Sequence, residues 1–242
     1  MRPRHLIANL DGKAAALLAG LTAAVVLLWG TPVVYPLKIL VVLFHEMSHG
    51  LAAVLTGGRI VEIQVVAQEG GLALSEGGSR FVTLSAGYLG SLLFGGVILV
   101  LASRTRADRA LALLLGVVLA AVTLLLVRPI LGFGFAFGAL CAVALIVSGW
   151  KLPAAVNDLL LRVVGLTSCL YAVLDIKSDV LDRPQLQSDA AMLAALTGLP
   201  TRFWGALWIV VALGLSSWLV LLACQRQPGG ESTAAKAAPP TD

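Results

Sequence analysis

The residues best suited to chemistry form the run His45-Glu46-Met47-Ser48-His49. No helix-breaking residue occurs between Lys38 and His49, so a helix is expected here. On a helix, residues four positions apart lie on one face, with Cβ atoms about 5–6 Å apart. His45 and His49 could therefore bind one metal ion at about 2.0–2.1 Å, with Glu46 beside them as a general base. This pattern is typical of zinc-dependent hydrolysis.

The motif is specific in this chain. It contains two of the three histidines, and chance placement would produce it on the order of once in a thousand. The segment around it is otherwise apolar, and ionisable groups inside a membrane span are costly and by default mark a functional site. The alternative is that the two histidines only form hydrogen bonds within a helical bundle, which leaves Glu46 without a role.

A catalytic zinc site also needs a third protein ligand, because such sites use three and leave the fourth position for water. His5 lies in the basic N-terminal arm and is not expected to reach the bilayer interior. The remaining candidates are the acids near membrane spans, namely Glu62, Glu69, Glu76, Asp108, Asp158, Asp175, Asp179, Asp182 and Asp189.

Membrane helices must position these groups. Of the 242 residues, 59% are hydrophobic and 12% are charged, whereas a soluble domain carries about 25% charged residues. Several apolar blocks reach about 18 residues or more, enough to cross a hydrocarbon core about 30 Å thick. Seven spans are predicted, at residues 14–34, 38–56, 81–102, 109–127, 130–149, 154–177 and 203–224.

The predicted fold is an all-α polytopic membrane protein with about six to seven transmembrane helices and a short β-hairpin-like insertion after the second span. Residues 1–224 are expected to form a single membrane-embedded domain. Residues 225–242 have few apolar side chains and are expected to form a disordered tail.

Depth in the membrane favours Asp175 as the third ligand. The second and sixth predicted spans cross in the same direction, so His49 and Asp175 lie roughly 8–10 Å deep if the sixth helix continues to about residue 180. Asp158 would lie near the opposite face. Asp179 and Asp182 share a helical face with Asp175 but would be shallower, where a solvated helix end is expected.

The segment between the second and third spans is different in character. Residues Arg59–Val66 alternate apolar and polar side chains and include several β-branched residues, and two glycine pairs follow. This pattern predicts a short hairpin that packs on the bundle or borders water, because strand edges are not tolerated against lipid. Its residues Ile60, Ile63 and Val65 are the candidate substrate-binding strand, which would pair with an extended substrate by strand addition.

Small residues open the third span, at Gly87, Gly90 and Ser91. Such faces let membrane helices approach closely. Tight packing against the metal-bearing helix is therefore expected, and a lining for substrate is the alternative.

The net charge is +4, and basic residues gather at the N-terminus (Arg2, Arg4 and Lys13) and in one short loop (Arg104, Arg106 and Arg109). Such clusters flank membrane helices on the cytoplasmic side. Nucleic acid is excluded as a partner because no dense basic face with aromatic residues is present. Counting seven spans puts the two clusters on opposite sides of the membrane, so the orientation stays open.

The sequence resembles the M50 family of intramembrane zinc metalloproteases, the site-2 protease group, and in particular its small M50B-like branch. The resemblance is carried by the strand-like segment and by the segments Phe44–Gly50, Ser85–Ser91, Tyr171–Ile176 and Gln187–Ala190. It implies that His45, His49 and Asp175 bind one Zn²⁺ per chain and that Glu46 is the catalytic base.

One departure from the family pattern concerns the third ligand. Many site-2 proteases carry an Asn-Pro pair and then Asp-Gly around this residue. In this chain Ile176 follows Asp175, and no Asn-Pro precedes it.

Together these features predict a protease of the cell membrane that cleaves membrane-protein or membrane-anchored peptide substrates within or near the bilayer, with Glu46 activating the attacking water. One alternative is a zinc-binding scaffold or chaperone, which would need no general base at position 46. Another is a metal transporter, which usually shows internal repeats and polar residues along a path. Here no repeat is visible and the polar residues gather at one level.

Overall fold

The protein is a bundle of membrane-length helices with one hairpin inserted between two of them. The computed structural model describes residues 9–182 and 187–226. Its elements in chain order are α2 (Gly12–Leu27), α3 (Tyr35–Leu55), β1 (Arg59–Val66), β2 (Gly70–Glu76), α4 (Arg80–Arg104), α5 (Asp108–Leu126), α6 (Phe133–Lys151), α7 (Ala154–Lys177), the π-helical turn η1 (Ser178–Asp182), α8 (Asp189–Thr197) and α9 (Thr201–Ala223).

Six of these helices, namely α3, α4, α5, α6, α7 with its extension to Val180, and α9, are long and apolar enough to cross a membrane. They confirm six of the predicted spans. The remaining predicted span, which is the first in the chain at residues 14–34, is wrong in length because α2 has only 16 residues. Although the apolar run continues to Trp29, Gly30 and Pro32 follow at once, and such residues end a helix.

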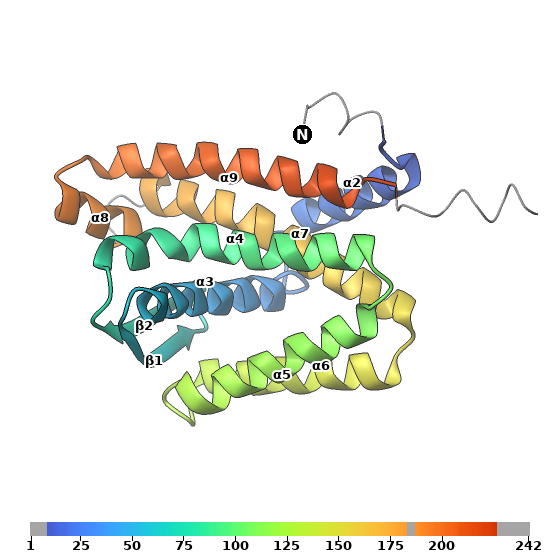
Figure 1. Ribbon diagram of the computed structural model, residues 1–242, viewed down its shortest axis with the longest axis horizontal. Coiled ribbons are helices and arrows are strands. Elements are labelled where there is room, and N and C mark those ends of the chain that lie inside the picture. Colours follow the sequence, from blue (N-terminus) through green and yellow to red (C-terminus); the bar gives the residue numbers. More distant parts are fainter. Residues whose placement is uncertain (1–8, 183–186, 227–242) are drawn as a thin grey trace, which may run out of the picture.

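The long helices form layers in which α3 is central. Figure 1 shows α9 on one side, α4 and α3 in the middle, and the antiparallel α5–α6 pair on the other side. In α3 67% of the most apolar window is buried, against 22% in α5 and in α9. A helix that is apolar all round and buried belongs to the core of the bundle, whereas α5 and α9 expose the side chains expected to face lipid.

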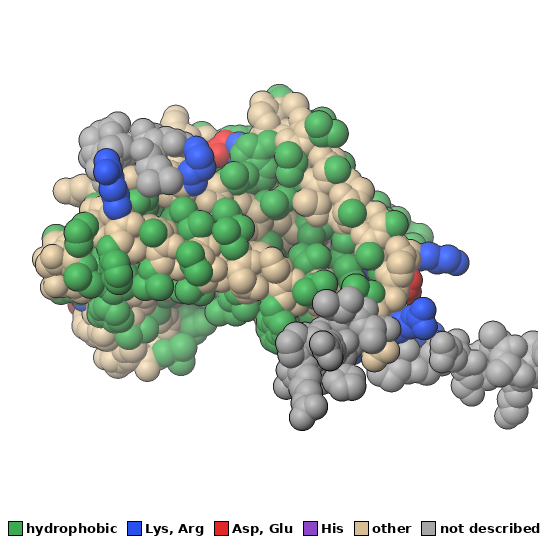
Figure 2. All heavy atoms as spheres, turned by 90° about the horizontal axis from the view of Figure 1, so that it is seen from above, with side chains coloured by type: hydrophobic (Ala, Val, Ile, Leu, Met, Phe, Trp, Pro, Cys, Tyr) green, Lys and Arg blue, Asp and Glu red, His purple; other side chains and the backbone are tan. Residues whose placement is uncertain are grey.

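The outer surface fits that assignment. Hydrophobic side chains spread over the face seen in Figure 2, and the charged side chains visible there lie mainly toward the ends of the bundle. Charged groups are costly in hydrocarbon and inexpensive at its borders, so this distribution suits a chain surrounded by lipid.

The predicted hairpin is confirmed. Strands β1 and β2 pair antiparallel, from Arg59 opposite Glu76 to Val66 opposite Gly70, with an irregularity between Ile60 and Glu62. The outer edge of β1 is partly covered, because the Arg128 amide donates to the Ile63 carbonyl at 2.8 Å and Ile63 forms a bridge with Val127. The hairpin lies along α3, so the bundle and not lipid covers its apolar side.

The start of α2 and the ends of α4 and α9 meet at one end of the bundle. The Asp11 amide donates to the Cys224 carbonyl at 2.8 Å, and the Arg104 guanidinium donates to Gln225 Oε1 at 2.8 Å. Lys13 and the Arg104–Arg109 loop are therefore at the same end, unlike the arrangement that a count of seven spans produced. The discrepancy arises because α2 was counted as a full crossing.

Two expectations fall wholly or largely outside the described residues. Of the predicted tail at residues 225–242, only Gln225 and Arg226 are described. His5 also lies outside the described residues. The single-domain boundary at residue 224 stays a prediction.

Candidate metal centre

Helix α3 brings the three residues of the His-Glu-x-x-His motif to one place. Pro36 lies in its first turn, where a missing amide costs nothing, and neither Pro nor Gly interrupts it before Gly50. Because His45 and His49 are four residues apart, they lie on the same side of α3. Their ring centroids are 4.7 Å apart. His49 and Glu46 are buried, with 7% and 5% of their surface exposed.

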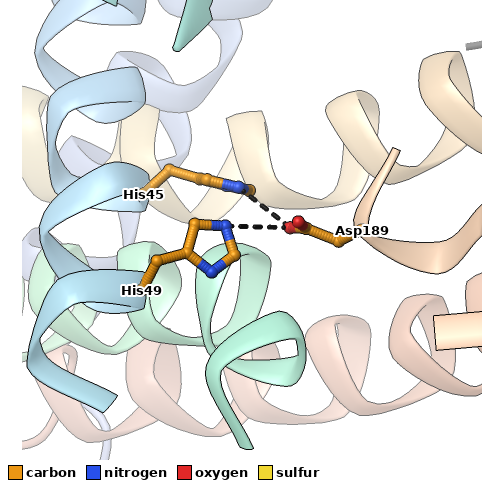
Figure 3. Close-up of side chains that lie close together, drawn as sticks. All are labelled: His45, His49 and Asp189. Carbon is orange, nitrogen blue, oxygen red and sulfur yellow. Dashed lines mark hydrogen bonds and ion pairs between the residues drawn. The ribbon is translucent and has the colours of Figure 1, made fainter. Parts of the chain in front are cut away.

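The carboxylate that meets these histidines belongs to Asp189. Its Oδ2 lies 3.0 Å from His45 Nε2 and 3.1 Å from His49 Nε2, and Figure 3 shows it pointing between the two rings. Among the described residues, His45, His49 and Asp189 are the group whose ligand atoms all lie within 4.8 Å of one another. The predicted third ligand, Asp175, is not part of this group, although it lines the same cavity.

Asp189 reaches this position because a short helix returns the chain to the level of the histidines. Helix α8 has nine residues, and its N-cap Ser188 accepts a hydrogen bond from the Ala191 amide at 3.3 Å. Asp189 is therefore the first residue of α8, where the helix dipole favours a negative charge. Depth along the membrane spans does not indicate this residue, because α8 is too short to be a span.

The electrostatics of Asp189 also suit a ligand. Burial by itself raises the pKa of its carboxyl, but the attraction of His49 and His45 outweighs this effect and lowers the pKa below its ordinary value. The carboxylate thus stays ionised, which is the form that a metal ion requires.

The donor set fits zinc. Around a tetrahedral zinc ion with ligand bonds of about 2.0–2.1 Å, neighbouring ligand atoms lie about 3.3 Å apart. The two separations of 3.0 and 3.1 Å are close to this value. In addition, His49 Nδ1 donates to the Thr83 carbonyl at 2.6 Å, so Nε2 is the ring nitrogen that a metal ion could bind. Such a backbone partner is the usual means of orienting a zinc-binding histidine.

Helix α4 approaches His45 and His49 so closely that only glycine fits. A Cβ atom at Gly87 would lie 2.3 Å from His45 Nε2 and 2.6 Å from His49 Nε2. One turn later, a Cβ atom at Gly90 would lie 2.4 Å from the Cβ of Ser48. The tight packing predicted from the small residues is therefore found, and Gly87 has the further role of leaving the space between the two imidazoles open.

Glu46 points toward the hairpin. A Cβ atom at Gly71 in β2 would lie 2.4 Å from Glu46 Oε1, so the carboxyl occupies the space that this glycine leaves. His45, His49, Asp189 and the backbone of Ala73 are its electrostatic neighbours. The carboxyl is thus held between the metal ligands and the edge of β2.

These groups line a cavity of about 640 Å³. Its wall includes His45, Glu46 and His49 from α3, residues 70–75 of β2, Tyr88 from α4, and Asp175, Asp179 and Asp189 from the C-terminal part. A cavity of this size could hold a short extended peptide beside His45, His49 and Asp189.

The fit between Gly71 and Glu46 leads to a prediction. Gly71→Ala should displace the Glu46 carboxyl but leave the three metal ligands in place. If Glu46 is the general base that the sequence predicts, cleavage should fall by roughly 100-fold at an unchanged metal content, since a misplacement of about 1 Å can cost about that factor in rate. Cleavage rate and zinc per chain, measured on the same preparation, check this.

The matched control is Gly70→Ala, because a Cβ atom at Gly70 would only touch Val66 Cγ2 at 3.4 Å. This variant should retain most of the activity. An equal loss in both variants would point to general damage to β2 and not to displacement of Glu46.

The other predicted acids have different surroundings. Asp158 forms an ion pair with Arg162 at 2.5 Å. Asp179 Oδ2 accepts a hydrogen bond from the Tyr88 hydroxyl at 2.8 Å. Asp108 is buried in the first turn of α5. Each glutamate of the hairpin contacts a polar side chain: Glu62 contacts Gln64, Glu69 contacts Lys38, and Glu76 contacts Arg59. The side chain of Asp182 lies outside the described part of the structure.

The candidate substrate strand is placed differently from the expectation. Ile63 and Val65 are buried in the apolar core, with 0% and 5% of their surface exposed, and Ile60 packs over Gly50. The cavity is instead lined by β2, from Gly70 to Ser75. If a strand edge receives substrate, it is therefore the edge of β2, whereas β1 attaches the hairpin to the bundle.

The sequence offered Asp189 only as one of nine candidate acids and favoured Asp175 over it, and it did not indicate that Gly71 faces Glu46 or that Gly87 faces the two histidines. For Asp189 a local signal existed, because a serine followed by an aspartate is a common start of a helix. For the two glycines the signal was only their small size. Which side chain each one faces depends on how α3, α4 and β2 pack.

The chain was also compared with known proteins. A model of the family described as Peptidase M50B-like matches residues 18–219. The matched region contains His45, Glu46, His49 and Asp189. Neither the comparison with curated proteins nor the comparison with solved structures gave a match.

Proposed function

The chain belongs to the peptidase M50B-like family, and from this membership and the geometry of the site we propose that it is an intramembrane zinc metalloprotease. It hydrolyses peptide bonds of membrane-protein or membrane-anchored substrates in the cell membrane. The observation that carries the proposal is the meeting of His45 Nε2, His49 Nε2 and Asp189 Oδ2 beside the buried Glu46, within a bundle of membrane-length helices.

In this proposal His45, His49 and Asp189 hold one zinc ion per chain. When bound, zinc supplies a Lewis acid for the scissile carbonyl and for the attacking water. The Thr83 carbonyl keeps the His49 ring in the required tautomer and orientation.

Glu46 serves as the general base. Its carboxylate takes a proton from the attacking water as the new C–O bond forms, and it returns a proton to the leaving amine as the C–N bond breaks. Its burial between the metal ligands and β2 supports this role, because a fixed carboxylate shielded from bulk water needs no reorganisation during the reaction.

We also propose that the substrate binds as an extended strand along the free edge of β2. A helical substrate must unwind before its carbonyl can be reached, and an extended segment can satisfy its backbone groups by strand addition. Support comes from the lining of the cavity by residues 70–75 and from the coverage of the other hairpin edge by Val127 and Arg128. Displacing β2 without changing a metal ligand should therefore impair cleavage at an unchanged zinc content.

The deciding experiment compares wild type with Glu46→Gln and His45→Ala in detergent. Zinc per chain is measured by elemental analysis, and cleavage is measured on a panel of single-span fusion proteins. Wild type should contain about one zinc per chain. Glu46→Gln should keep its zinc and lose cleavage by about 10²- to 10⁴-fold, which is the usual contribution of a general base. His45→Ala should lose both.

Cleavage by Glu46→Gln at the rate of wild type would contradict the proposal. The protein would then be a metal-binding membrane protein with another task, such as a scaffold.

A further inference from the structure

Lys38 is a largely buried ionisable residue near the start of a membrane-length helix, and the metal chemistry does not use it. It lies in the first two turns of α3, and only 12% of its side chain is exposed. Its Nζ is 2.8 Å from Glu69 Oε1 and 5.3 Å from the centre of the Trp29 ring. A buried charge is costly unless it is paired. The partner of Lys38 is thus the tip of the hairpin.

The backbone at the tip is in a conformation that suits another residue. Glu69 has φ 60°, in the left-handed region that favours glycine or asparagine. Three-residue hairpin loops commonly carry glycine at such a position. The chain has Glu here, where a side chain is unfavourable for the backbone but can reach Lys38.

A second contact holds the same tip. The Tyr35 hydroxyl donates to the Ala67 carbonyl at 2.6 Å. Both contacts come from side chains at the start of α3, and both are made to the loop that joins β1 to β2. The base of the hairpin is held separately, since the Ser79 amide donates to Thr56 Oγ1 at 2.8 Å.

The tip leads directly into the part of β2 that borders the metal site. Gly70 follows Glu69, and Gly71 is the residue against which the Glu46 carboxyl lies. Gln68 and Glu69 line the same cavity as the metal ligands. A shift of the tip along α3 would therefore move the edge of β2 relative to Glu46 and the metal ligands.

We infer that the Lys38–Glu69 ion pair is a latch that fixes the hairpin tip along α3 and so holds the edge of β2 in register beside the metal site. Lys38 and Glu69 are positioning residues for cleavage, and neither touches the reacting atoms. The inference rests on the proposed function only in linking the position of β2 to cleavage. The position of the hairpin can be measured independently.

The first measurement is cleavage of the single-span fusion panel by Lys38→Met, Glu69→Gln and the exchanged pair Lys38→Glu with Glu69→Lys. Each single variant should lose roughly 10- to 100-fold in kcat/KM, since a misplacement of about 1 Å can cost about 100-fold, and should keep the wild-type zinc content. The exchanged pair should recover most of the loss, which the mere removal of a buried side chain would not explain.

The matched control is Arg59→Met. Arg59 pairs with Glu76 at the other end of the same hairpin, where 72% and 58% of the two side chains are exposed. Exposed ion pairs contribute little, so this variant should cleave like wild type. A loss as large as that of Lys38→Met would overturn the assignment of the latch to the tip.

The second measurement is hydrogen–deuterium exchange of the backbone amides in residues 66–76, which needs no substrate. Lys38→Met should speed exchange there by about tenfold or more, because loosening a local anchor lowers the cost of local opening. Arg59→Met should not. Unchanged exchange together with wild-type cleavage in Lys38→Met would refute the latch.

The two proposals can fail separately. If Glu46→Gln cleaves like wild type, the protease mechanism is wrong, and the exchange result alone decides whether the tip is latched. If Glu46→Gln is inactive and Lys38→Met is indistinguishable from wild type in both measurements, the mechanism stands and the latch does not.

Discussion

Asp189→Ala is expected to empty the metal site, whereas Asp175→Ala is expected to leave it filled. The carboxylate of Asp189 lies 3.0 and 3.1 Å from the Nε2 atoms of His45 and His49. Asp175 lines the same cavity but is not among the three residues whose ligand atoms all lie within 4.8 Å of one another. Changes outside the ligand shell already cost about 10- to 100-fold in metal affinity. Removing one of three ligands should cost more, so the purified Asp189→Ala variant should contain far less than one zinc per chain.

Elemental analysis of detergent-purified protein measures this directly, with His45→Ala as the reference for loss of a ligand. Asp175→Ala is the matched control, since it removes the same side chain from the same cavity. Asp189→Asn separates charge from size, because an amide oxygen is a much weaker zinc ligand than a carboxylate. Loss of zinc from Asp175→Ala with full retention in Asp189→Ala would return the third position to Asp175 and would contradict the geometry described above.

The membrane helices were predictable because the local sequence of each one is enough to specify it. A run of about 20 apolar residues must cross the bilayer as a helix, whatever its neighbours are. The strand pattern of Arg59–Val66 was equally local, since alternation and β-branched residues need no tertiary information. The error at α2 arose where apolar residues continue past Leu27 but the following Gly30 and Pro32 end the helix.

The part of the candidate metal site that lies on one helix was predictable. His45, Glu46 and His49 lie within two turns, so helical geometry alone brings them together. The third ligand depends on where a nine-residue helix, 140 residues later in the chain, returns to the bundle. Neither hydropathy nor residue spacing predicts where α8 packs against the bundle. The relation between the two hairpin edges is similarly tertiary, because Arg128 covers one edge from a loop that follows α5.

Gly87→Ala is expected to abolish metal binding although it adds a single methyl group. The new Cβ would lie 2.3 Å from His45 Nε2 and 2.6 Å from His49 Nε2, which are distances at which real Cβ atoms are not found. A zinc ion must lie about 2.0–2.1 Å from both nitrogens, so the methyl group would compete for the space that the metal needs. Either the metal is excluded, or α4 moves away from α3. The first outcome should reduce zinc to near the level of His45→Ala while the protein remains folded.

Two other glycines make this result interpretable. In Gly214→Ala the added Cβ meets nothing within 4 Å, so zinc should stay at the wild-type level, and the helix should be stabilised by up to about 1 kcal/mol. In Gly90→Ala the Cβ would press on Ser48 at 2.4 Å, one turn from the ligands, and so tests displacement of α4 without a methyl group at the metal position. Equal loss of zinc in Gly87→Ala and Gly90→Ala would mean that separation of the helices is the cause. Retention of about one zinc per chain in Gly87→Ala would mean that the metal does not lie between His45 and His49 as the ligand geometry requires.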